Sequence, residues 1–302
     1  MTDWRKGRSF GLVYDLLTVA LATFGVVGAF VSFRAGGSWI VAGAVFTVGV
    51  SLVLWGSFVE PYRLVVRTYR EPLVPEPKAW VRLVFISDMH AGPFHDRRWF
   101  ERVGLEVASL GADLLVFGGD FVSYRADAVM DVSPLGRVRG RLGTYFILGN
   151  HDYLDDPASV RRTATGWGIA DLTNGHASVQ KDGRTLQLSG VDDCWYGRPA
   201  VPPMRVAATT PHVTIAHEPD IALDVKAGDT DLIIAGHTHG GQIRLPFVGA
   251  LAGIPSLLGR RADRGRKTIN GVPLIVSEGL GESDVRARLF CPPEVTVVEI
   301  GI

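Results

Sequence analysis

The chain has 302 residues, and its 31 Lys and Arg side chains balance its 31 Asp and Glu side chains. A chain without net charge lacks the general attraction for phosphate backbones, so nucleic-acid binding is not expected. Hydrophobic residues make up 47% of the sequence, which excludes a disordered or fibrous protein. Cys194 and Cys291 match neither a disulfide scaffold nor a zinc-binding spacing.

The apolar residues are concentrated near the N-terminus, where residues 9–59 contain only two charged side chains, Asp15 and Arg34. As helices, residues 10–33 and 39–59 would reach about 36 and 31 Å, enough to cross a hydrocarbon core of roughly 30 Å. We therefore predict that residues 1–60 form a membrane anchor of two transmembrane helices. A helical hairpin buried inside a soluble protein is the alternative.

The orientation of this hairpin follows from its flanking cations. Only Arg34 lies in the short connection, whereas both outer flanks are basic, with Arg5, Lys6 and Arg8 before the first helix and Arg63, Arg67 and Arg70 after the second. The positive-inside rule then places both ends in the cytoplasm, as in a multi-pass protein of the inner or cytoplasmic membrane. Asp15 lies about one and a half turns from that side, where we expect it to reach the headgroups.

Residues 61–79 are predicted to be a juxtamembrane linker. Tyr62 and Tyr69 alternate with arginines, a composition suited to an anionic leaflet, and Pro72, Pro75 and Pro77 would stiffen the segment. The folded domain is expected to span residues 80–302 and to lie close to the membrane.

Within this domain, strand-like apolar runs alternate with helical patterns. We expect a helix over 97–110 and strands over 81–87, 113–117, 144–148, 213–216 and 232–235. Shorter runs at 169–173, 177–180 and 184–189 indicate an antiparallel stretch. The sequence therefore predicts an α/β fold with two stacked mixed sheets.

Polar residues gather where these strands end. The five segments that follow strands are Ser-Asp-Met-His (87–90), Gly-Gly-Asp (118–120), Gly-Asn-His-Asp (149–152), Ala-His-Glu (216–218) and Gly-His-Thr-His-Gly-Gly (236–241). Each segment alone is weak evidence, since most such loops are solvated turns. Loops beyond strand ends of open α/β sheets meet in one crevice, so their conjunction predicts a shared site.

These ordered blocks resemble the signature of the calcineurin-like metallophosphoesterases, and all five blocks are intact. The resemblance covers residues 81 to about 300 and implies a layered αββα sandwich, the calcineurin-like phosphoesterase fold. It also implies that Asp120 bridges two divalent metal ions. The remaining ligands would be Asp88, His90 and His239 for one ion and Asn150, His217 and His237 for the other.

Such a pair of cations polarises phosphoryl oxygens and lowers the pKa of water, which is the chemistry of phosphate-ester hydrolysis. His151 has no metal assigned by the resemblance, so we expect it to act as a catalytic acid or hydrogen-bond donor, with Asp152 orienting its ring. Mixed imidazole and carboxylate ligands favour Mn²⁺, with Fe and Zn²⁺ as alternatives.

A membrane hairpin before this domain resembles the anchored branch of the family that includes UDP-2,3-diacylglucosamine hydrolases of lipid A synthesis. That resemblance implies hydrolysis of a pyrophosphate to UMP and lipid X at the cytoplasmic leaflet. The expected partners are the lipid bilayer and a lipid-linked or nucleotide-linked phosphate. The alternatives are a broad phosphomonoesterase or protein phosphatase and a non-catalytic, membrane-tethered binding module.

Several other residues have both a structural and a functional interpretation. The basic run 260–267 fits either a solvated loop or a contact with headgroups or a nucleotide. Arg125 and the Trp195-Tyr196 pair could contact phosphate and a base or sugar, or be a surface charge and a packed aromatic pair. Glu278 could be an additional carboxylate near the substrate phosphate, where it would be unfavourable, or a solvated loop residue.

Overall fold

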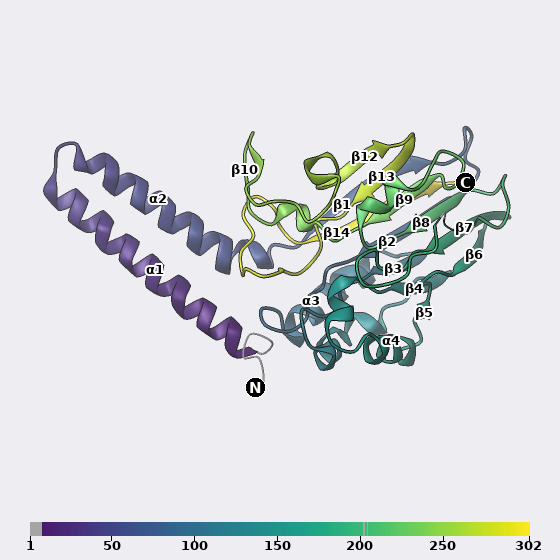
Figure 1. Ribbon diagram of the computed structural model, residues 1–302, viewed down its shortest axis with the longest axis horizontal. Coiled ribbons are helices and arrows are strands. Elements are labelled where there is room, and N and C mark those ends of the chain that lie inside the picture. The colour runs from purple at the N-terminus through teal and green to yellow at the C-terminus, as the bar shows by residue number, and fades with distance from the viewer. Residues whose placement is uncertain (1–7, 202, 204) are drawn as a thin grey trace.

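Two long antiparallel helices stand apart from the rest of the molecule in the computed structural model, which describes residues 8–201, 203 and 205–302 (Figure 1). They are α1 (Arg8–Ala35) and α2 (Trp39–Phe58), so the predicted hairpin is confirmed. Both are long and apolar enough to cross a membrane, and only 28% and 17% of their most apolar windows are buried. That exposure argues against a hairpin packed inside a soluble core. Arg5 and Lys6 lie outside the described residues.

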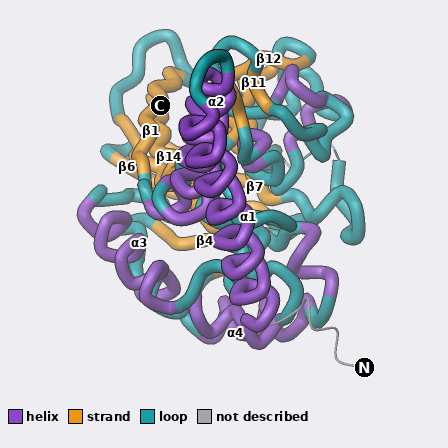
Figure 2. The backbone as a smooth tube through the Cα atoms, turned by 90° about the vertical axis from the view of Figure 1, so that its left-hand side faces the viewer, coloured by secondary structure: helices purple, strands orange, loops and turns teal. Residues whose placement is uncertain are grey.

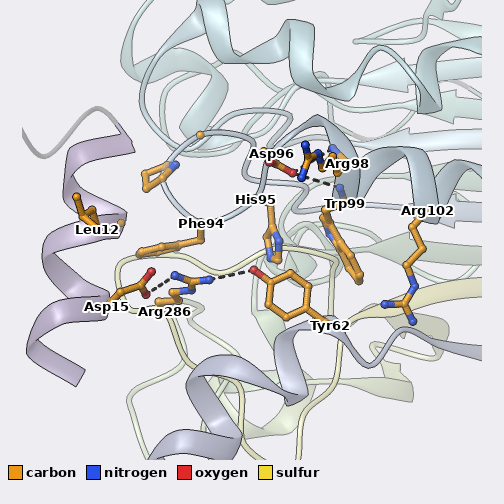
Figure 3. Close-up of a pocket in the computed structure, with 13 residues that line it drawn as sticks. Leu12, Asp15, Tyr62, Phe94, His95, Asp96, Arg98, Trp99, Arg102 and Arg286 are labelled. Carbon is orange, nitrogen blue, oxygen red and sulfur yellow. Dashed lines mark hydrogen bonds and ion pairs between the residues drawn. The ribbon is translucent and has the colours of Figure 1, made fainter. Parts of the chain in front are cut away.

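The start of α1 contacts the C-terminal domain (residues 65–302) through a polar bridge. Asp15 forms an ion pair with Arg286, whose Nη2 donates to the Tyr62 hydroxyl at 3.0 Å (Figure 3). The ring of Phe94 packs 5.8 Å from that of Phe10. Asp15 thus has a protein partner in addition to the predicted position near the headgroups, and it borders a cavity of about 500 Å³.

The end of α2 is hydrogen-bonded to the same domain. The backbone N–H of Arg288 donates to Gly56 O at 2.8 Å, and that of Cys291 donates to the Glu60 carboxylate at 2.7 Å. The Trp55 indole also donates to Glu60, at 2.8 Å. These bonds satisfy buried polar groups on both sides of the junction, so the hairpin has a defined attachment rather than a free tether.

Two mixed sheets form the C-terminal domain, as predicted, and each has six strands. In spatial order the first contains β1 (Val65–Pro72), β14 (Glu294–Gly301), β2 (Trp80–Ile86), β3 (Leu114–Gly118), β4 (Gly143–Ile147) and β5 (Ala170–Asp171). The second contains β12 (Gly265–Ile269), β13 (Val272–Val276), β9 (Leu232–Ala235), β8 (His212–Ile215), β7 (Arg184–Gly190) and β6 (His176–Lys181). Of the strands in these two sheets, β1, β12, β13 and β14 were not predicted. A separate two-stranded ribbon contains β10 (Arg244–Leu245) and β11 (Gly249–Ala250).

The sheets face each other across an apolar layer that includes Phe85, Val116 and Ile234. The outer face of the first sheet is covered by α3 (Arg97–Ser109) and α4 (Pro157–Gly166). Asp96 caps α3 by accepting from two backbone N–H groups, the arrangement that starts a helix. Short 3-10 helices cover the second sheet, namely η6 (Pro219–Leu223) and η8 (Gly259–Ala262). Both outer layers of the expected sandwich are therefore present, one of them built from short turns.

The predicted linker over 61–79 requires correction, because residues 65–72 are the edge strand β1. This strand pairs in parallel with β14, from Val65 beside Glu294 to Pro72 beside Gly301. Its partner lies more than 200 residues further along the chain, so no local pattern revealed the pairing. The cations of the segment are used in the fold, since Arg67 pairs with Glu294 at 3.0 Å and the Arg70 guanidinium lies over the Trp80 ring.

Candidate metal centre

The strand ends of both sheets converge on one site. Parallel strands β2, β3 and β4 carry Asp88, Asp120 and Asn150 beyond their carboxyl ends. In the facing sheet, parallel strands β8 and β9 carry His217 and His237 in the same way. Because the two sheets stack, their carboxyl edges meet and the predicted ligands become neighbours.

One group of side chains gathers around Asp88, His90 and His239. The Nε2 atoms of His90 and His239 are 3.0 Å apart, and His239 Nε2 is 3.4 Å from Asp88 Oδ1. His90 Nε2 is 3.4 Å from Asp120 Oδ2. All of these residues are buried, and Asp88, His90 and His239 are placed so that they could hold a metal ion.

A second group lies on the other side of Asp120. His217 Nε2 is 3.2 Å from Asp120 Oδ2 and 3.1 Å from Asn150 Oδ1. His237 Nδ1 is 3.0 Å from the same amide oxygen. Asp120 therefore contacts both groups through one carboxylate, the position that the sequence predicted for a bridging ligand.

Backbone carbonyls hold the outer nitrogen of three of these imidazoles. His217 Nδ1 lies 2.8 Å from Gly118 O, His239 Nδ1 lies 3.1 Å from Gly281 O, and His237 Nε2 lies 2.6 Å from Pro255 O. An outer N–H that donates to a carbonyl leaves the inner nitrogen with its lone pair facing the site. The inner nitrogens then face carboxylate and amide oxygens, which are also acceptors. A cation bound between them would stabilise this arrangement.

The backbone at the site is strained. Five of the twelve non-glycine residues with positive φ among those described are predicted ligands: Asp88, His90, Asp120, His237 and His239. Positive φ is unfavourable for side chains with a Cβ and persists where the surroundings enforce it, often at functional sites. Two glycines permit the close approach, since a Cβ at Gly149 would lie 2.5 Å from Asp120 Oδ1 and one at Gly236 would lie 2.5 Å from Asp88 Oδ2.

The electrostatics of the cluster suit cations. Burial lowers the pKa of His90 and His239 well below the usual value, and that of His237 to about 4, so these rings are neutral ligands at pH 7. Burial opposes ionisation of Asp120, yet the charge of His217 lowers its pKa well below the usual range. The carboxylate in turn raises the pKa of His217 against the effect of burial, so a cation that binds this ring would displace a proton from it. The donor set thus fits divalent cations bound by nitrogen and oxygen.

His151 lies at the cavity beside this cluster. Its backbone N–H donates to Asp120 at 2.8 Å, and its Nδ1 is 2.6 Å from Ser123 O. Its Nε2 is 3.4 Å from the Ser283 hydroxyl. The ring is therefore oriented by a carbonyl, with Nε2 directed toward the space that a substrate would fill.

The predicted role of Asp152 as the group that orients this ring is wrong. Its carboxylate is fully buried and accepts from the backbone N–H groups of Phe121 at 2.9 Å and Gly149 at 3.0 Å. Burial raises its pKa to about 8. Asp152 ties the two loops that carry Asp120 and Asn150 together, because a short side chain after a tight turn reaches the adjacent loop and not its neighbour's ring.

The centre opens into a cavity of about 360 Å³. Trp195 is half exposed on one side, with its ring centroid 4.7 Å from that of His237, which favours the functional interpretation of this residue. Residues that sequence reasoning missed line another side, in particular Gln242, Ser283 and Asp284. They follow the last predicted motif and carry no ligand spacing, so no local signal identified them.

Arg288 is a further residue that the sequence did not reveal. Its buried guanidinium donates to the carbonyls of Glu278, Gly281 and Cys291, at 2.9, 2.5 and 3.0 Å. Gly281 O also faces His239, so Arg288 holds the loop that orients this ring. Arg288 follows Asp284 and Arg286, and charged residues that alternate with uncharged ones in this way are typical of a surface loop.

Of the two interpretations of Glu278, the solvated loop residue is wrong, because this carboxylate is buried and pairs with Arg264 at 2.6 Å. In the basic run 260–267, Arg266 pairs with Glu71 at 2.6 Å. These pairs favour the structural interpretation for most of the run. Arg125 is an exposed charge that pairs with Asp127, which also supports the structural interpretation.

A carboxylate shared by two imidazole-rich groups, held at the joined edges of two sheets, is the arrangement expected of a metal-dependent phosphoesterase. The family comparison agrees with this class. The calcineurin-like phosphoesterase family matches residues 81–241, more than half of the chain, and the chain belongs to that family of metal-dependent phosphoester hydrolases.

Three relatives are similar to this chain over more than half of its length. The uncharacterized metallophosphoesterase YkuE of Bacillus subtilis is 27% identical over 80% of this chain and 87% of its own length. The phosphodiesterase YaeI of Escherichia coli is 30% identical over 72% of this chain and 82% of its own length. A zebrafish transmembrane protein with a metallophosphoesterase domain is 32% identical over 56% of this chain, which spans 43% of that protein. The two apolar helices, together with this relative that is named as a transmembrane protein, indicate that the chain associates with a membrane.

Proposed function

We propose that the protein is a membrane-anchored hydrolase of phosphodiester or pyrophosphate bonds that uses two divalent cations. The observation that carries the proposal is the convergence of seven predicted ligands from five loops, with Asp120 between the two groups. Asp88, His90 and His239 would hold one ion, and Asn150, His217 and His237 the other, with Asp120 shared. When bound, the two cations supply Lewis acidity for phosphoryl oxygens and acidify water.

His151 is assigned the donor for the leaving oxygen. Its Nε2 faces the cavity while Ser123 O fixes the other ring nitrogen. A positioned donor acts where negative charge develops during bond cleavage, so this ring would bind the leaving group or transfer a proton to it. Trp195 supplies an apolar face at the cavity for the group attached to the phosphate.

The anchor and the phosphodiesterase relative support the proposed substrate class. A hydrolase fixed to a bilayer searches in two dimensions for an amphiphile, which supports a lipid-linked phosphate. UDP-2,3-diacylglucosamine, cleaved to UMP and lipid X, is the specific substrate proposed. Manganese is the first metal to test, followed by Fe and Zn²⁺. The bias of Lys and Arg around the hairpin supports a multi-pass protein of the inner or cytoplasmic membrane with its active domain in the cytoplasm.

The first test uses the full chain in detergent micelles with Mn²⁺. Hydrolysis of bis-p-nitrophenyl phosphate should exceed that of p-nitrophenyl phosphate, and a strong preference for the monoester would favour a phosphomonoesterase or protein phosphatase. Release of UMP from UDP-2,3-diacylglucosamine would support the specific substrate. Activity on the simple diester without UMP release would reject it and retain the diesterase class.

A non-catalytic tethered module is the remaining alternative. The retention of all seven predicted ligands argues against it, since a binding scaffold has no need of a complete donor set. Absence of metal-dependent hydrolysis across mono- and diester substrates, in a protein that binds two equivalents of Mn²⁺, would favour the module.

A further inference from the structure

An uncharged loop next to the metal centre leaves large apolar side chains in solvent. The apolar loop, residues 245–259, reads Leu-Pro-Phe-Val-Gly-Ala-Leu-Ala-Gly-Ile-Pro-Ser-Leu-Leu-Gly and has no charged residue. Phe247 is fully exposed, Leu257 is 86% exposed, and Val248 and Leu251 are each more than half exposed. Apolar clusters of this kind on a folded surface mark sites of interaction.

The apolar loop is held in place rather than loose. The Arg260 guanidinium donates to the carbonyls of Val248 and Ala250, at 3.2 and 2.5 Å. Asp220 accepts from the backbone N–H of Leu257 at 2.9 Å and from the Ser256 hydroxyl at 2.5 Å. The exposed apolar side chains are therefore presented on a fixed scaffold, which lowers the conformational entropy that binding would cost.

A continuous set of backbone bonds joins this loop to the membrane hairpin. Gly56, near the end of α2, accepts from Arg288 N at 2.8 Å, and the adjacent Leu289 exchanges bonds with Gln242 and Arg244, each at 2.9 Å. Arg244 begins β10. In Figure 1 the β10 ribbon rises from the domain on the side where the hairpin leaves it, and Figure 2 shows β11 close to α2 from the second direction.

We propose that the apolar loop is a second membrane contact, which inserts Phe247 and Leu257 into the leaflet from which α2 emerges. The lipid bilayer is the occupant because the loop is continuous with the hairpin that already requires one. Arg261 is exposed beside the loop and can meet anionic headgroups. Aromatic and aliphatic side chains backed by cations are the composition of interfacial anchors.

This contact would determine how substrate reaches the metal centre. Ala252, Gly253 and Pro255 of the same loop line the cavity that contains His151 and Trp195. A loop seated in the leaflet would open the cavity toward the lipid surface. This inference rests on the proposed function. The scissile phosphate would belong to a lipid whose acyl chains stay in the bilayer during hydrolysis.

Fluorescence tests the membrane contact without reference to activity. The full chain, with Cys194→Ser, is reconstituted into vesicles of phosphatidylcholine and phosphatidylglycerol and labelled with an environment-sensitive dye at Phe247→Cys. Asp182→Cys, in the exposed turn between β6 and β7, is the matched control on the part of the domain far from the hairpin. Quenching by spin-labelled lipid at position 247 but not at 182 is expected. Equal quenching at both positions, or protection of position 247 by a second copy of the chain, overturns the proposal.

A second measurement tests the substrate route. Phe247→Asp with Leu257→Asp should lower hydrolysis of a vesicle-embedded lipid phosphodiester about tenfold, in line with the loss of two apolar anchors, and leave bis-p-nitrophenyl phosphate hydrolysis unchanged. Val206→Asp, at a similarly exposed apolar position beside β7, is the control and should change neither rate. If the double variant and Val206→Asp hydrolyse the vesicle-embedded lipid at equal rates, the proposed substrate route is wrong. If the unaltered chain hydrolyses none of these esters, the proposed function is wrong. The fluorescence measurement still tests the membrane contact, because it does not depend on activity.

Discussion

The hairpin and the C-terminal domain use apolar side chains in opposite ways. Phe24 and Phe30 of α1 are 72% and 65% exposed, whereas Phe85 and Phe146 between and beside the sheets are completely buried. The domain builds its own core in water, while the hairpin needs a bilayer as its solvent. The junction between them is polar, with Asp15, Arg286 and Glu60 bonded across it. The hairpin and the metal centre therefore lie in separate parts of the chain, and substitutions in one should leave the other unchanged when the substrate is soluble.

The largest effect is expected for Asp120→Ala, which removes the carboxylate that contacts His90 in one ligand group and His217 in the other. Hydrolysis should fall by on the order of 10³-fold, because charge stabilisation of this kind dominates such reactions. Metal content measured by mass spectrometry should fall too, while partition into vesicles stays unchanged. Asp127→Ala, at an exposed surface carboxylate, is the control. Retained activity would refute the assignment of Asp120 as a shared ligand.

His151→Ala should lower the rate by about 10²–10⁴-fold on diesters with a poor leaving group. The loss should be much smaller with p-nitrophenolate as leaving group, since that anion needs little help from a donor. Two bound metal ions should remain. An equal loss on both kinds of substrate would show that His151 supports the structure and not the leaving group.

Arg288→Met probes the loop that carries Glu278, Gly281 and Cys291. The change leaves several buried carbonyls without a donor, so the free energy of unfolding should fall by about 3 kcal/mol. Urea denaturation of the full chain in micelles measures this effect. Arg184→Met, at an exposed position, should change stability by less than about 0.5 kcal/mol. Similar midpoints for the two variants would contradict the role assigned to Arg288.

The smallest effect is expected at the bridge between α1 and the domain. A double-mutant cycle with Asp15→Asn and Arg286→Gln should give a coupling energy of about 1 kcal/mol, as for a partly exposed ion pair. Hydrogen exchange over residues 92–99 should rise in both single variants, while the rate on soluble diesters stays the same. Unchanged exchange would mean that the bridge does not hold the two regions together.

The sequence alone determined the hairpin, the two mixed sheets and the set of side chains around Asp120. Each of these has a local signature: long uncharged runs for the helices, short apolar runs for the strands, and polar motifs placed directly after strand ends. Loops at one edge of stacked sheets meet, which predicted a shared site, and the resemblance of the ordered motifs to the calcineurin-like metallophosphoesterases implied which side chains lie around Asp120.

Only the tertiary structure decided the features that have no local signature. β1 became a strand because β14 pairs with it across the whole domain, Asp152 serves the adjacent loop instead of His151, and Arg288 is buried because carbonyls of its own loop surround it. The local sequence pattern shows which polar groups a segment carries. The partners of those groups depend on the packing that brings other segments within hydrogen-bond distance.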